Sequence, residues 1–82
     1  MVAISTVSRC PETGAFRFTF EAGDVEVSAD LSVCWLEEKR EAWLRFITVD
    51  RVRTRDAALS DAVEVWVAEH QREVFLAALE TV

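Results

Sequence analysis

The most constraining feature of this sequence is the alternation of apolar and polar side chains in AFRFTFEAGDVEVSA, residues 15–29. Phenylalanines recur at every second position from Phe16 to Phe20, and only an extended strand places three such rings on one face. Gly23 can adopt the positive φ of a tight turn, and the alternation then resumes over residues 25–29. The segment therefore predicts a β-hairpin with one apolar face and one charged face.

The residues before this hairpin predict an additional strand. VAIS, residues 2–5, is apolar and β-compatible, and RCPETG, residues 9–14, contains two turn-forming residues. Pro11 fixes its own φ and Gly14 can close the loop, so we expect a turn that leads into the hairpin.

Residues 31–48 fit two structures. Six apolar residues fall on one stripe of a helix that begins at Asp30 or Ser32, and EEKREAW has high helix propensity. The stripe consists of Leu31, Trp35, Ala42, Trp43, Phe46 and Ile47. The alternative is a second hairpin, in which LSVCWL and AWLRFITV are joined by EEKRE. We favour the helix because this turn contains no Gly, Asn or Asp.

The C-terminal segment predicts a helix that begins at Asp56 or Ser60 and ends near Leu79. Its D-x-x-E pattern at Asp61 and Glu64 resembles a capping box. The apolar face of this helix consists of Leu59, Ala62, Val63, Trp66, Val67, Val74, Ala77 and Ala78. These residues would cover the apolar side of a small sheet.

Together these elements predict a single α+β domain spanning residues 1–82. Its small antiparallel β-sheet contains the hairpin 15–29 and an extra N-terminal strand. The sheet packs against the C-terminal helix and a second helix. Apolar residues make up 51% of the chain, which is enough for one core.

The sequence contains no pattern typical of catalysis, so we expect neither an enzyme nor a bound cofactor or metal. His70 is the sole histidine and lies between Glu69 and Gln71, which favours a position on a helix surface or at an interface. Cys10 and Cys34 have no metal-ligand spacing, and we expect reduced thiols. Without about 20 consecutive apolar residues or a signal peptide, the sequence favours a cytoplasmic protein.

Charge is distributed unevenly in this acidic chain, whose formal net charge is −6. Residues 39–55 carry six Lys or Arg against two acids, whereas both flanking segments are acidic. We expect an acidic face that binds a basic protein surface and consists of Glu21, Asp24, Glu26, Asp30, Glu37 and Glu38. The alternative is that these carboxylates form a solvated surface that keeps the protein soluble.

Three arginines at alternate positions form a second charged feature, with a fourth nearby. The strip consists of Arg45, Arg51, Arg53 and Arg55. It either pairs with acids on neighbouring elements or forms a patch that faces an anion. Direct binding to duplex DNA is not expected, because the rest of the molecule would repel the phosphates.

In size, charge and order of elements the chain resembles small acidic phage-encoded inhibitors of the anti-CRISPR type. The resemblance implies a non-catalytic inhibitor that acts in the host cytoplasm and whose acidic surface engages a basic, nucleic-acid-handling protein such as a CRISPR effector complex. The alternative is a small bacterial protein that acts by self-association or regulation through its helical face, for example as a homodimer. Membrane binding is not expected.

Overall fold

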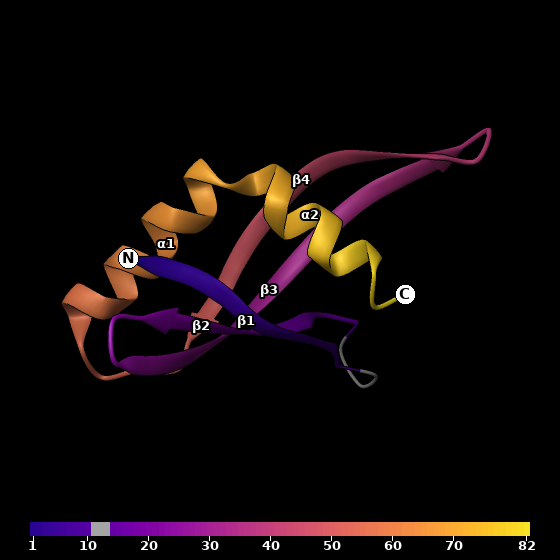
Figure 1. Ribbon diagram of the computed structural model, residues 1–82. Coiled ribbons are helices and arrows are strands. Elements are labelled where there is room, and N and C mark those ends of the chain that lie inside the picture. Colours follow the sequence, from indigo (N-terminus) through magenta and orange to yellow (C-terminus); the bar gives the residue numbers. More distant parts are fainter. Residues whose placement is uncertain (11–13) are drawn as a thin grey trace.

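The computed structural model describes residues 1–10 and 14–82, and these form a four-stranded antiparallel sheet with two helices on one face (Figure 1). The elements follow one another as β1 (Val2–Arg9), β2 (Phe16–Ala22), β3 (Val25–Glu38), β4 (Glu41–Val52), α1 (Ala57–Glu69) and α2 (Gln71–Leu79). Each strand pairs with its neighbours in the chain, in the order β1-β2-β3-β4. The predicted α+β class is confirmed.

The hairpin predicted over residues 15–29 is formed by β2 and the first half of β3. Ala22 is opposite Val25, so Gly23 and Asp24 form a two-residue turn, and Gly23 has φ +66°. β1 is longer than the predicted VAIS and pairs along β2. Pro11, the other predicted turn residue before the hairpin, lies outside the described residues.

The core forms between the apolar face of the sheet and the two helices. The phenylalanines from Phe16 to Phe20 and the inward residues of β3 are buried against Val63 and Val67 of α1 and Val74 of α2. A second layer of rings extends this core, because Trp35 lies 6.0 Å from Phe16 and 6.1 Å from Phe75, measured between ring centroids. The helices cover this inner face only (Figure 1).

The helix predicted over residues 31–48 is wrong, and the alternative second hairpin is what forms. β3 and β4 pair through this segment, from Leu31 opposite Val49 to Glu38 opposite Glu41. Lys39 and Arg40 form the two-residue turn with φ values of 53° and 70°. Two positive φ values are typical of a type I′ turn, which occurs here without Gly, Asn or Asp.

The predicted C-terminal helix is present but divided into α1 and α2. Asp56 caps α1 by accepting hydrogen bonds from the backbone N–H groups of Ala58 and Leu59, so the start at Asp56 is confirmed and Asp61 is not the cap. The division lies at His70, whose backbone departs from helical geometry with φ −124° and ψ 38°. The second helix of the fold therefore comes from this break.

Candidate protein-binding surface

The outer halves of β3 and β4 form an arm, residues 32–48, which extends past the ends of the helices (Figure 1). Side chains alternate between its two faces. Trp35 and Leu44 form one cross-strand pair on the inner face, where Trp35 contacts Phe75 of α2. The opposite, outer face of the arm has no helix over it in the described part of the chain.

Large apolar side chains occupy this outer face. Leu36 is opposite Trp43, and the next outer pair along the arm is Cys34 opposite Phe46. The residues are 53% exposed at Leu36, 58% at Trp43 and 51% at Phe46. We call these three residues, together with the free thiol of Cys34, the outer strip. Half-exposed aromatic residues on one uncovered strand pair are a typical feature of a binding surface.

β4 contains two β-bulges, and the first of them places Trp43 and Phe46 on the same face. Arg45 is an extra residue in β4, because Cys34 pairs with Phe46 and the next residue, Trp35, pairs with Leu44. Asp50 is a second extra residue, between the pairs that involve Arg51 and Val49. In a regular strand, side chains on the same face are two residues apart. Each bulge adds one residue, so the inner residues Leu44 and Ile47 are three apart, and so are Val49 and Val52.

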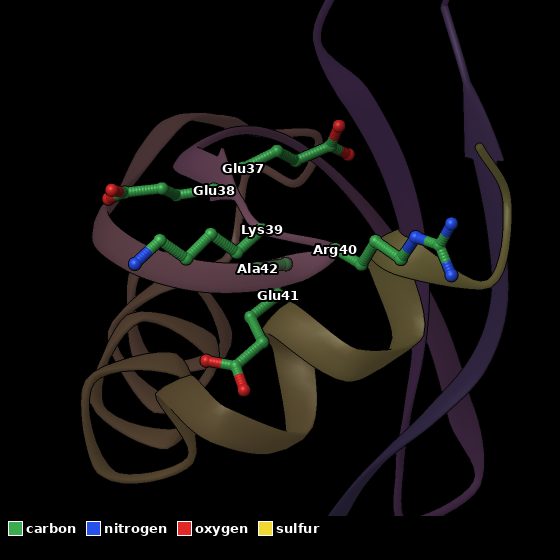
Figure 2. A pocket seen from close by; sticks show the side chains of 6 residues that line it. All are labelled: Glu37, Glu38, Lys39, Arg40, Glu41 and Ala42. Carbon is green, nitrogen blue, oxygen red and sulfur yellow. The ribbon is translucent and has the colours of Figure 1, made fainter.

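The tip of the arm is charged and lacks the convergence of a catalytic site. Figure 2 shows the side chains of Glu37 and Arg40 pointing to one side, those of Glu38 and Lys39 to the other, and that of Glu41 away from both. The hollow that they line is open to solvent and no two carboxylates converge on a common point in it. The tip therefore offers charge for recognition.

An ion-pair cluster lies farther down the outer face. The Asp30 carboxylate accepts hydrogen bonds from Arg17 Nε at 3.1 Å and from Arg53 at 2.8 Å, and its side chain is 22% exposed. Partial burial would raise the pKa of Asp30, but hydrogen bonding and charge from Arg53 and Arg17 outweigh it and hold this pKa below its ordinary value of 3.8. Asp30 therefore links β2, β3 and the segment after β4, rather than offering a free carboxylate.

A polar group separates this cluster from the outer strip. The Asp50 carboxylate accepts hydrogen bonds from Ser32 at 2.6 Å and from Thr48 at 3.0 Å. Both hydroxyls lie on the outer face, because Ser32 and Thr48 form a cross-strand pair between Cys34 and Asp30.

The predicted acidic face is not brought together as one patch. Glu21 and Glu26 are opposite one another beside the turn at Asp24, whereas Glu37 and Glu38 lie at the other end of β3. Glu37 lies eleven positions after Glu26, which is roughly 35 Å along a strand. The predicted acids thus form two separate groups, and Asp30 between them is paired with arginines.

The predicted arginine strip is also divided. Arg53 pairs with Asp30, as the local-pairing alternative expects, and Arg51 is opposite Asp30 on the same face. Arg45 lies in the bulge and Arg55 follows the end of β4. Among the described residues, Arg45, Arg51 and Arg55 form no ion pair within the distance limit of such pairs.

His70 has a structural position at the break between the helices. Its ring stacks on that of Trp66 with centroids 4.3 Å apart, and Nδ1 lies 2.8 Å from the backbone carbonyl of Trp66. Within residues 1–10 and 14–82, no group of three or more His, Cys, Asp or Glu is arranged to hold a metal ion. In the same part of the chain, neither helix is long and apolar enough to cross a membrane.

Comparison with protein-family models, with curated proteins and with solved structures finds no match for this chain. The sequence-based prediction placed Trp43 and Phe46 on the stripe of a helix and missed the outer strip, although the signal is present. VCWL and AWL are apolar at consecutive positions, which in a strand pair means that both faces are apolar.

Proposed function

We propose that this chain is a non-catalytic protein-binding domain that acts in the cytoplasm and binds through the outer face of its β3–β4 arm. The observation that carries the proposal is the exposure of Leu36, Trp43 and Phe46 at half or more of their surface on one side of a projecting hairpin. Their exposed apolar area is roughly 300 Å², which is the size of the largest patch on many monomers and is often functional.

The arm is well placed to be a contact surface. Its inner face is anchored to the core by Trp35 and Phe75, so the outer face is presented by a supported strand pair. Trp and Phe are residues that give large binding energies when a partner desolvates them, and the charged tip beside them can form a polar rim. The sequence-based alternative was self-association through the helical face. The exposed Leu36, Trp43 and Phe46 instead favour the outer face of the arm as the contact surface.

Site-specific photo-crosslinking tests this proposal. A benzophenone amino acid is placed at Phe46, and in a matched control at Val65 on the outer side of α1, which is 55% exposed. In living bacterial cells expressing the chain, we expect discrete protein adducts from position 46 and not from position 65. Equal labelling from the two positions would refute the proposal.

A second function is favoured by the acids at the β2–β3 turn. Glu21 and Glu26 are directly opposite, and like charges at such positions destabilise a strand pair. A basic partner surface would relieve this repulsion. We therefore also propose that this end of the sheet binds a basic, nucleic-acid-handling protein, as an inhibitor of the anti-CRISPR type would.

Salt dependence and charge reversal test the second function. A purified CRISPR effector complex is the probe, and binding is measured at about 0.1 M and about 0.5 M salt. We expect binding at the lower salt only, with a loss of tenfold or more in the Asp24→Lys, Glu26→Lys variant. The control is Asp61→Lys on α1, which should bind like the unmodified chain. This function would be refuted if binding were unaffected by both the salt concentration and the charge reversal, or if no binding were observed at either salt concentration.

A further inference from the structure

The outer strip is an exposed apolar surface that a binding partner would cover. The edges of the sheet indicate how this partner approaches. Both edge strands contain β-bulges, at Ser5 in β1 and at Arg45 and Asp50 in β4. Bulged edges are a common protection against pairing with another strand. A partner is therefore expected to pack against the face of the arm, not to extend the sheet.

The distribution of charge along the outer face points to the identity of this partner. The Cys34–Phe46 pair lies four residues of β3 from the tip pair, Glu38 and Glu41, and four residues in the other direction from Asp30 opposite Arg51. Each interval is about 13 Å. The tip pair carries two carboxylates. Of the two turn cations between them, Lys39 points to the side of Glu38 and Arg40 to the other side (Figure 2), so the tip pair together with Lys39 has a net charge of −1. The far position carries Arg51 with Arg17 and Arg53 around one Asp30, and is therefore net positive.

A face with opposite charge at equal distances on either side of a central apolar pair is complementary to itself. We propose that a second copy of this chain packs against the outer face of the arm, antiparallel to the first, about a two-fold axis close to Cys34 and Phe46. The two copies then place the carboxylates of each tip beside the arginines around Asp30 of the other.

The polar group between these positions also fits this arrangement. Leu36 and Trp43 lie two residues from the axis on one side, and Ser32 and Thr48 lie two residues from it on the other. Each Trp43 therefore faces the hydroxyls and the Asp50 carboxylate of the second copy. The indole N–H is a donor and the Asp50 carboxylate has further acceptor capacity beyond its two hydroxyl bonds.

The apolar area of the outer strip indicates how tightly two copies would bind. Roughly 300 Å² of apolar surface per copy is under half of the 800 Å² or so that each partner of a standard interface buries. Polar contacts must supply the rest, so a dissociation constant of micromolar order is expected, about 1 to about 100 µM. The acids at the Glu21–Glu26 end lie beyond the overlap and stay accessible.

Analytical ultracentrifugation of the full chain tests self-association over about 1 to about 300 µM. We expect a monomer–dimer equilibrium that Trp43→Lys weakens at least tenfold. The matched control Val65→Lys, at a similarly exposed site on α1, should change the dissociation constant by less than twofold. Circular dichroism of both variants verifies that they fold. A chain that stays monomeric throughout, or equal effects of the two substitutions, would overturn the inference.

The position of the axis has its own test. In a Cys10→Ser background, a short bismaleimide should link two copies through Cys34, because the axis places the two thiols opposite one another across the gap of about 10 Å between face-packed sheets. A Glu26→Cys variant that lacks Cys10 and Cys34 is the control and should not be linked at the same rate. Dimers that form without faster linkage at Cys34 would refute this axis.

Charge exchange supplies an independent test of the antiparallel arrangement. Glu41→Arg and Arg51→Glu should each weaken the dimer several-fold, and the chain that carries both should recover most of the affinity. Additive losses would refute the pairing.

The inference depends on the proposed function, because both use the outer strip, but their failures are distinguishable. A monomeric chain that still crosslinks another protein from position 46 retains the protein-binding function and loses only the second copy as its partner. A monomeric chain without crosslinks from position 46 loses both.

Discussion

At the scale of single residues, Asp30 is the polar side chain on which the outer face most depends. Its pKa lies below 3.8 because Arg53 and Arg17 favour the ionised form. A lowered pKa in the folded state adds stability at pH values above the unfolded pKa, and this stability is lost as the pH falls through the folded value. The contribution of Asp30 is therefore present at neutral pH and absent in strong acid.

We expect Asp30→Asn to lower the free energy of unfolding by about 0.5 to about 1 kcal/mol at pH 7, since both arginines are partly exposed and solvent screens the pairs. At about pH 2 the deficit should be smaller than at pH 7, because protonation of Asp30 as the pH falls through its folded pKa removes the charge on which the pairs depend. Urea unfolding at both pH values measures the difference. Asp24→Asn, in the exposed turn, is the control and should have little effect at pH 7. A deficit for Asp30→Asn that is the same at both pH values would contradict the ion-pair explanation.

At the scale of elements, the failure to predict β4 has a physical cause in its bulges. Trp43 and Phe46, two members of the predicted helical stripe, are three residues apart, yet both lie on the outer face because Arg45 is an extra residue. A spacing of three is typical of a helix, so the bulged strand resembled a helical stripe. By contrast, the unbulged alternation of Phe16–Phe20 was sufficient to predict the first hairpin.

The turn at Lys39 and Arg40 is an element whose local sequence opposes its conformation. Positive φ at a residue with a Cβ costs free energy, and Asn-Gly is the preferred pair in a type I′ turn. We expect Lys39→Asn, Arg40→Gly to raise the free energy of unfolding by about 1 kcal/mol. Thermal and urea unfolding measure this. The control, Lys39→Ala, Arg40→Ala, removes the same charges without relieving the strain, so equal stability of the two variants would contradict the explanation.

At the scale of the whole molecule, the fold class was predictable and the position of the proposed binding surface was not. The alternation of residues 16–29 predicted a sheet and the helical spacing after residue 56 predicted a helix that covers it, so the fold class follows from patterning alone. The position of the outer strip depends on β3 pairing with β4, a non-local contact opposed by the local helix propensity of EEKREAW. The predicted acids do not form one patch for a related reason, because the length of β3 separates Glu26 from Glu37.

The same architecture predicts a gradient of local stability along β3. Val27, Ala29 and Leu31 are buried in the core with Val63 and Val74, whereas residues 36–38 near the tip are exposed. Amide groups in the first region should exchange with solvent only through global unfolding, and those of the arm through local opening that costs less free energy.

Hydrogen exchange measured at about 1 µM and about 300 µM tests this gradient together with the dimer. At the lower concentration we expect the arm to exchange at least tenfold faster than β2. At the higher concentration the arm alone should slow, because a second copy covers it, and Trp43→Lys should abolish the slowing. An arm as protected as β2 when dilute would contradict the gradient. Slowing spread evenly over all strands would place the contact between copies elsewhere, since only a partner on the outer strip protects the arm selectively.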